Sequence, residues 1–149
     1  MKRTFYSSLI AIASVILPGA LPKAQAAGCS TVTLRGAYGF LVDATILPPL
    51  ASSPAGTPRS ILGRISFDGR GNFTNTLTIN DNGVVTHSMD SGTYTVNPDC
   101  TGKILTNGGT RTIEIVIVDG GKEFLQLRTD DPHILFHFNT AKQQLLAEN

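Results

Sequence analysis

Two cysteines carry the most definite chemistry in this sequence. Cys29 and Cys100 are 71 positions apart, and an even pair of cysteines in an oxidising compartment predicts a disulfide. Closing a loop of that length stabilises a fold by about 4 kcal/mol through chain entropy. A metal site would need more ligands than two remote cysteines supply. We therefore expect a Cys29–Cys100 disulfide, no metal site and no cofactor.

Histidine is a common metal ligand, and the sequence has three histidines. His133 and His137 share a face in either a helix or a strand. In a strand, however, four positions at ~3.3 Å each separate them by about 13 Å, too far for one ion. His87 could approach either from a neighbouring strand, but no motif links them. The expectation is that all three histidines face solvent.

No catalytic motif emerges from the remaining polar residues. The serines lie in no nucleophile elbow or Ser-x-x-Lys pattern, and no glycine-rich run leads into a Lys-Ser or Lys-Thr pair. Asp43, Glu114 and Asp130 could pair across strands as acid and base, but any β-protein offers such coincidences. We assign no catalytic residues and leave enzymatic activity open, with binding preferred.

The elements that position these residues are short runs of alternating apolar and polar residues, separated by turn signals. Asp90–Gly92 is interpreted as one such turn. Asp68–Asn72 has oxygen ligands at alternate positions, yet a hairpin is favoured there over a calcium loop. The tail 141–149 is expected to form one frayed helical turn or stay disordered. The predicted strands cover 34–42, 59–67, 73–80, 84–89, 93–96, 103–107, 110–118, 123–130 and 133–138.

Eight or nine consecutive strands with short connections predict an all-β domain. Short loops favour antiparallel neighbours, and closing an eight-stranded meander into a barrel removes its exposed edges. A two-sheet β-sandwich is the alternative, because it suits the same strand spacing. The one long connection, 47–58, is rich in proline, serine and alanine and could be a lid, a binding loop or a tether.

The N-terminus has the order of a secretory signal peptide. Lys2 and Arg3 precede an apolar run from Leu9 to Leu17, and Ala24-Gln25-Ala26 forms a small-x-small cleavage site. The apolar run is about half the ~20 residues that a membrane-spanning helix needs. The predicted organisation is a signal peptide over 1–26 and one domain over 27–149, secreted or periplasmic. A lipoprotein acylated at Cys29 is the weaker alternative.

Charge narrows the possible partners. Removing residues 1–26 takes away three basic residues and no acid, which leaves 123 residues with a net charge of −2. The remaining basic residues stand singly, so the electrostatic footprint of a nucleic-acid-binding protein is missing. We expect no nucleic-acid partner and no membrane span.

Several turn-centred phrases resemble a group of secreted bacterial proteins of unknown function. The phrases cover 34–40, 63–72, 92–102 and 116–123, and Asn97-Pro98-Asp99-Cys100-Thr101-Gly102 is the most specific of them. These proteins look like small calycin-type barrels, so the resemblance implies an eight-stranded, lipocalin-like fold. It brings no activity and no catalytic residues.

A barrel of eight strands can fill itself with side chains or hold one small ligand. The leading hypothesis is a protein that binds a small, partly apolar ligand. Tyr38, Phe40 and Tyr94 would line the barrel, or equally close its core. Arg128 is a polar anchor near the rim in this hypothesis, or an outward residue covering apolar surface.

Two alternatives stay open. The first is an interaction module or inhibitor in the cell envelope, which an exposed apolar patch over 47–50 would support. The second is a barrel-type isomerase or cyclase. An open apolar cavity favours the ligand-binding protein, a filled barrel the module, and a cavity with paired polar groups the enzyme.

Overall fold

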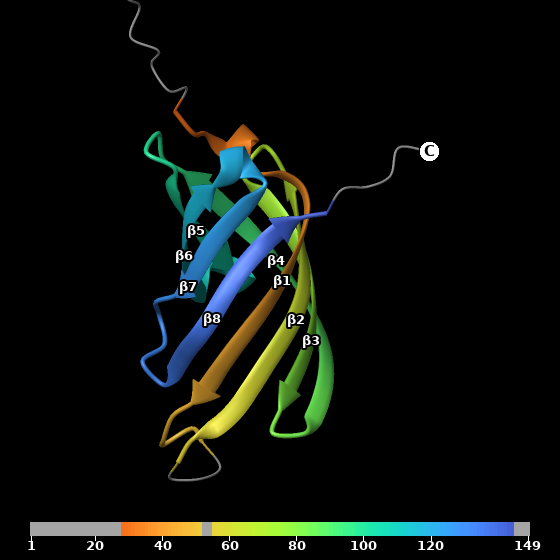
Figure 1. Ribbon diagram of the computed structural model, residues 1–149, viewed down its shortest axis with the longest axis vertical. Coiled ribbons are helices and arrows are strands. Elements are labelled where there is room, and N and C mark those ends of the chain that lie inside the picture. Colours follow the sequence, from red (N-terminus) through yellow and green to blue (C-terminus); the bar gives the residue numbers. More distant parts are fainter. Residues whose placement is uncertain (1–27, 52–54, 145–149) are drawn as a thin grey trace, which may run out of the picture.

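The computed structural model describes residues 28–51 and 55–144. The predicted signal peptide, 1–26, lies outside these ranges, as do 52–54 and 145–149. Eight strands and three short 3₁₀ helices account for most of the described chain (Figure 1). The strands are β1 (Arg35–Ile46), β2 (Thr57–Asp68), β3 (Asn72–Asp81), β4 (Val84–Val96), β5 (Thr101–Thr106), β6 (Arg111–Val118), β7 (Glu123–Arg128) and β8 (Ile134–Gln143); the 3₁₀ helices are η1 (Thr31–Thr33), η2 (Asn107–Gly109) and η3 (Asp119–Gly121).

The sheet is an antiparallel meander closed into a barrel. Each strand pairs with the next, and β1 completes the circle by pairing with β8, from Tyr38 opposite Gln143 to Ile46 opposite Ile134. A bulge between Asp43 and Ala44 shifts the register along this last seam. The predicted eight-stranded barrel is confirmed, and the sandwich alternative is wrong.

Several predicted boundaries differ from the structure, among them the end of the first strand, which continues past Val42 to Ile46. The predicted turn at Asp90–Gly92 is part of β4, whose ladder with β3 continues without a break from Asp81–Val84 to Asn72–Thr93. The predicted helical or disordered tail begins too early, because Ala141 is buried in β8 opposite Phe124. The long connection is shorter than expected, since β2 begins at Thr57.

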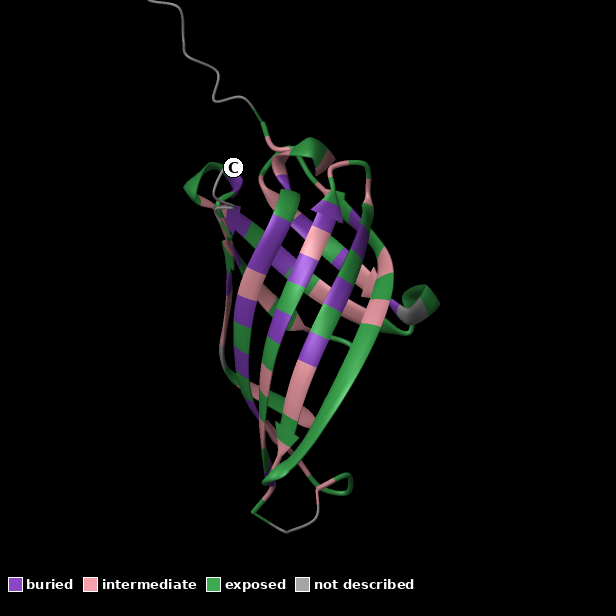
Figure 2. Ribbon diagram, turned by 90° about the vertical axis from the view of Figure 1, so that its right-hand side faces the viewer, coloured by how far each residue is buried: buried purple, intermediate pink, exposed green. Residues whose placement is uncertain are grey.

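An aromatic core closes one half of the barrel. Phe67 packs its ring against those of Tyr38, Phe73, Tyr94 and Phe124, at centroid distances of 4.7–6.3 Å. These rings come from five strands, and their edge-to-face contacts stabilise the core beyond simple burial. Figure 2 shows the buried positions concentrated in this half, below the chain that carries η1.

The predicted disulfide is confirmed at the closed end. Cys29 and Cys100 are bonded, with their Cα atoms 4.9 Å apart. The backbone N–H of Cys29 also donates to the carbonyl of Pro98, and that of Ile117 to the carbonyl of Cys100. The bond therefore attaches the start of the described chain to the turn between β4 and β5, in the loop where the sequence placed it.

The other half of the barrel is open. β4 pairs with β5 only from Gly92 onward, so its first eight residues pair with β3 alone among the described strands. β7 pairs with β8 only over Glu123–Leu125, although β8 continues along β1 to Ile134. The long strands β1 to β4 and β8 thus extend beyond the short strands β5 to β7 (Figure 1). We call this part of the molecule the open half.

Candidate functional site

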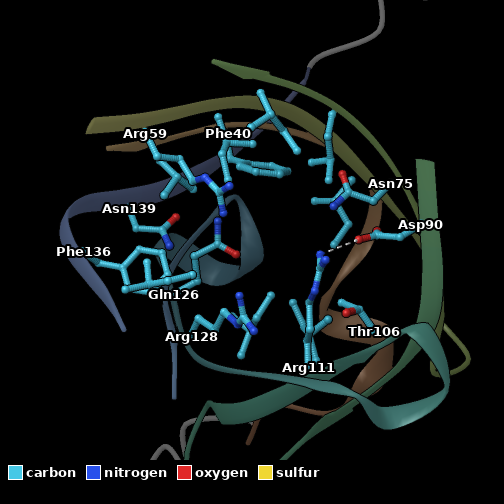
Figure 3. Close-up of a pocket in the computed structure, with 18 of the residues that line it drawn as sticks. Phe40, Arg59, Asn75, Asp90, Thr106, Arg111, Gln126, Arg128, Phe136 and Asn139 are labelled. Atoms are coloured by element: carbon cyan, nitrogen blue, oxygen red, sulfur yellow. Dashed lines mark ion pairs between the residues drawn. The ribbon is translucent and has the colours of Figure 1, made fainter. Parts of the chain in front are cut away.

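The open half contains a cavity of about 200 Å³ inside the barrel. Every strand contributes to its lining, because the inward positions of each alternating run converge there (Figure 3). Most of the wall is apolar, and the polar residues occupy definite parts of it. The lining consists of Phe40, Val42, Arg59, Ile61, Ile65, Phe73, Asn75, Leu77, Ile79, Asp90, Ile104, Thr106, Arg111, Ile113, Gln126, Arg128, Ile134, Phe136 and Asn139.

Phe40 lines this cavity together with Phe73, which also belongs to the aromatic core. The Phe40 ring lies directly over Gly63 of β2, where an added Cβ would come within 2.2 Å of that ring. Glycine at position 63 therefore allows the ring to lie flat against the neighbouring strand. Isoleucines from β2, β3, β5 and β6 also belong to the apolar wall.

A row of polar side chains crosses the wall formed by β3 to β6. Asn75 and Asp90 are register partners on β3 and β4, and Thr106 and Arg111 are register partners on β5 and β6. Thr106 also pairs with Gly92, two positions from Asp90. Partners in an antiparallel ladder hold their Cβ atoms about 5 Å apart, so the four side chains form one continuous row. We call Asn75, Asp90, Thr106 and Arg111 the polar row.

Three members of the polar row have buried atoms without a hydrogen-bond partner in the described chain. These atoms are Asn75 Oδ1, Asp90 Oδ1 and Thr106 Oγ1, and the fourth such atom in the described chain, Asn139 Oδ1, lines the same cavity. Buried polar groups are almost always paired with protein or water. The four unpaired atoms of the described chain are thus gathered around one cavity.

Asp90 and Arg111 form a loose ion pair. Asp90 Oδ2 is 3.8 Å from Arg111 Nη1, beyond hydrogen-bond distance, and only 6% of the Asp90 side chain is exposed. Burial raises the pKa of Asp90, while the charge of Arg111 and a hydrogen bond from the Asn75 side chain lower it in part. The Arg111 side chain is 44% exposed and lies between the cavity and solvent.

Two further arginines reach the cavity but are tightly paired. Arg59 donates from Nε and Nη2 to Asp81 at 2.5 and 2.6 Å. Arg128 makes the same bidentate arrangement with Asp130 at 3.0 and 2.9 Å, and its Nη2 is 3.4 Å from Asp131. Bidentate pairing holds each guanidinium in place and balances its charge. Figure 3 shows both on the side opposite Asn75 and Asp90.

The four residues predicted to bind a ligand divide into two pairs. Phe40 and Arg128 line the cavity, and Arg128 points inward with 20% of its side chain exposed. The expectation that Arg128 covers the outer surface is therefore wrong. Tyr38 and Tyr94 belong to the aromatic core, where burial raises the pKa of both hydroxyls. The Tyr38 hydroxyl donates to the Gly121 carbonyl, and that of Tyr94 is 2.9 Å from the carbonyls of Thr31 and Leu34.

The other motifs lie away from the cavity lining. His87 and His137 contact Thr78 and Thr45 on the exposed surface, and His133 contacts the Pro48 carbonyl. The Asp68 carboxylate accepts hydrogen bonds from the backbone N–H groups of Arg70 and Asn72 and from the Asn72 side chain. These bonds lower its pKa to about 2. Asp68 is thus engaged in closing the β2–β3 hairpin.

The polar row was not predicted from the sequence. Asn75 interrupts the apolar face of Phe73, Leu77 and Ile79, and this was the available signal. Asp90 was not identified as a cavity residue because Asp90–Gly92 was interpreted as a turn. Thr106 and Arg111 flank a tight connection, where polar residues are ordinary.

No protein-family model, curated protein or solved structure matches this chain. Within residues 28–51 and 55–144, no helix is long and apolar enough to cross a membrane.

Proposed function

We propose that this chain is an exported protein that binds one small, partly apolar molecule in the open half of its barrel. The observation that carries the proposal is the apolar cavity with four unpaired polar atoms in its wall. A buried polar atom without a partner costs about 1–3 kcal/mol. A ligand that pairs with these atoms and covers the apolar wall recovers that cost. The predicted signal peptide and the disulfide support export.

The volume limits the size of the ligand. A cavity of about 150 Å³ accepts benzene, whereas sites for drug-sized molecules have about 300–1,000 Å³. The cavity here has about 200 Å³, which suits a single ring or a short branched chain with one polar group. A fatty acid or a steroid would project through the open end.

The experiment that tests the proposal is native mass spectrometry of the protein purified from its own compartment without reductant. We expect the mass of residues 27–149 less two hydrogens, with a reproducible small adduct that denaturation removes. The bare protein mass in repeated preparations would contradict the proposal. A lipid-sized addition that survives denaturation would instead show acylation of Cys29.

A pair of adjacent variants locates the adduct. Ile61 lines the cavity, whereas Leu62 is on the outer face of the same strand and is 62% exposed. Ile61→Trp should fill the cavity and abolish the adduct, and the matched control Leu62→Trp should retain it. An adduct that survives Ile61→Trp would be bound elsewhere.

The polar row also supports a second candidate, a barrel-type isomerase. A buried carboxyl with a raised pKa is suited to proton transfer. Such enzymes usually need a second acid or base. Among the described residues that line the cavity, however, Asp90 is the only carboxyl, and no histidine, lysine, cysteine or tyrosine is present. The released adduct, incubated with fresh protein, should keep its proton NMR spectrum. New signals that disappear in Asp90→Asn would favour the isomerase.

The interaction-module alternative has its own support on the outer surface. Leu50 is 62% exposed next to the half-buried Leu47. Leu41 and Leu62 are register partners on the outer face, each about half exposed or more. Exposed apolar residues of this kind are also common on proteins without partners. The cavity therefore carries the stronger argument.

A further inference from the structure

The polar row contains acceptors and donors in a definite order. Asn75 and Asp90 face each other across the β3–β4 ladder, and each presents an unpaired, buried Oδ1 atom. These two atoms can only accept hydrogen bonds when Asp90 is ionised. A ligand group that satisfies both must donate two N–H or O–H bonds.

Arg111 supplies donors at the other end of the row. Its guanidinium has five N–H donors. Within the described chain its recorded partner is the Asp90 carboxylate, at a distance too long for a hydrogen bond. Arg111 is therefore available to donate to an acceptor atom of a ligand that already contacts Asp90. Figure 3 shows its tip directed at Asp90 inside the cavity.

The charges of the site select against a charged ligand. Asp90 and Arg111 form one ion pair, and Arg59 and Arg128 are paired with Asp81, Asp130 and Asp131, so each arginine of the site already faces a carboxylate. An anionic group next to Arg111 would face the buried Asp90 carboxylate. A cationic group next to Asp90 would face Arg111. Like charges in a partly desolvated site repel strongly, so a neutral group fits best.

Building on the proposed function, we propose that the ligand carries a neutral head group with a hydrogen-bond donor beside an acceptor, as in a primary carboxamide. Its two N–H groups meet Asp90 Oδ1 and Asn75 Oδ1, and its carbonyl oxygen accepts from Arg111. Its apolar body packs on the wall formed by Phe40, Ile104 and Phe136.

Four probes of nearly equal shape test this specificity: toluene, benzamide, benzoate and benzylamine. Each has one ring and differs in its head group. Binding to the disulfide-bonded protein, freed of adduct, is measured by calorimetry at pH 7. We expect benzamide to bind about tenfold or more tighter than the other three, the gain from two or three matched hydrogen bonds.

The outcomes separate this proposal from the proposed function. Equal binding of toluene and benzamide, lost in Ile61→Trp, would leave the cavity as a binding site and overturn the amide specificity. Tighter binding of benzoate or benzylamine would overturn it in favour of a charged ligand. If none of the four probes binds, the proposed function fails as well.

Two variants test the assigned residues. Asp90→Leu and Arg111→Met should each weaken benzamide binding about tenfold and leave toluene binding within about twofold. The control Ser91→Ala changes an exposed neighbour and should bind both probes as the parent does. If Asp90→Leu does not fold, Arg111→Met decides alone, because its half-exposed side chain has no hydrogen bond to the described chain. Unchanged benzamide binding in Arg111→Met would overturn the proposal.

Discussion

At the scale of single residues, Asp90 is expected to weaken the fold at neutral pH. Burial raises its pKa, and Arg111 and Asn75 offset this only in part. A carboxyl with a raised folded-state pKa favours folding below its unfolded pKa, and that contribution is lost as pH rises through the folded value. Above the unfolded pKa, the burial of Asp90 is therefore a cost of keeping the polar row.

The substitution Asp90→Asn should stabilise the free protein. It removes the buried charge, and the half-exposed Arg111 can turn towards water. We expect the free energy of unfolding at pH 7 to rise by more than the roughly 0.5 kcal/mol of an ordinary surface substitution, and the gain to vanish near pH 3, where both states protonate Asp90. Urea denaturation at the two pH values measures this.

The control for this prediction is an exposed aspartate on an outer face. Asp43 is exposed on β1, so Asp43→Asn should leave the free energy of unfolding within about 0.5 kcal/mol. A loss of stability in Asp90→Asn at pH 7 would mean that the ion pair with Arg111 is net stabilising. The polar row would then not be kept at the expense of stability.

Only some of the residues of the candidate site could be predicted from the sequence. The run 123–130 alternates Phe124, Gln126 and Arg128 with Leu125 and Leu127. In the structure Gln126 and Arg128 line the cavity, and Phe124 belongs to the core. The pairing of Asn75 with Asp90 was not predictable in the same way. It depends on the β3–β4 register, which becomes known only when β4 is recognised as one strand.

At the scale of elements, turn signals predicted most strand boundaries and failed at β4. Gly92 was interpreted as a turn residue, yet it is an extended strand residue at a close approach between strands. A Cβ at position 92 would come within 2.0 Å of the Leu105 carbonyl oxygen. Glycine is therefore needed for space rather than for a turn, a distinction that composition alone does not make.

This interpretation of Gly92 can be tested by adding one methyl group. Gly92→Ala should lower the free energy of unfolding by about 2–3 kcal/mol, because backbone rather than a flexible side chain must move. Gly39 is a matched strand glycine whose Cβ would meet only the Gln144 side chain, at 3.6 Å. Gly39→Ala should change the free energy by less than about 0.5 kcal/mol.

Urea denaturation of both glycine variants gives the comparison. An equal effect of the two substitutions would show that the strands can separate at Gly92, and that the close approach to Leu105 is not fixed. Circular dichroism before unfolding confirms that each variant keeps the β-sheet signal of the parent.

At the scale of the whole molecule, the two halves of the barrel differ in how they are packed and paired. The closed half holds the disulfide and five packed aromatic rings, which supply stability. The open half lacks complete pairing around β4 and β8, and its wall combines apolar residues with the polar row. Stability concentrated at one end permits unpaired polar atoms at the other.

The sequence predicted the closed half more completely than the open half. Paired cysteines, alternation and turn residues are local signals, and they predicted the barrel and its disulfide. The open half depends on where neighbouring strands stop pairing, for example at Gly92 of β4 and Leu125 of β7. These differences in strand length depend on how all eight strands pair around the barrel. No single segment of the sequence contains that information.

The most direct test of this account is a crystal structure of the protein purified from its own compartment with no ligand added. We predict density for a small non-protein molecule in the open half, against Phe40 and Phe136, with polar contacts to Asp90 and Arg111. A contradictory result would be an open half in which side chains have collapsed into the cavity and Asn75 and Asp90 are satisfied by protein groups.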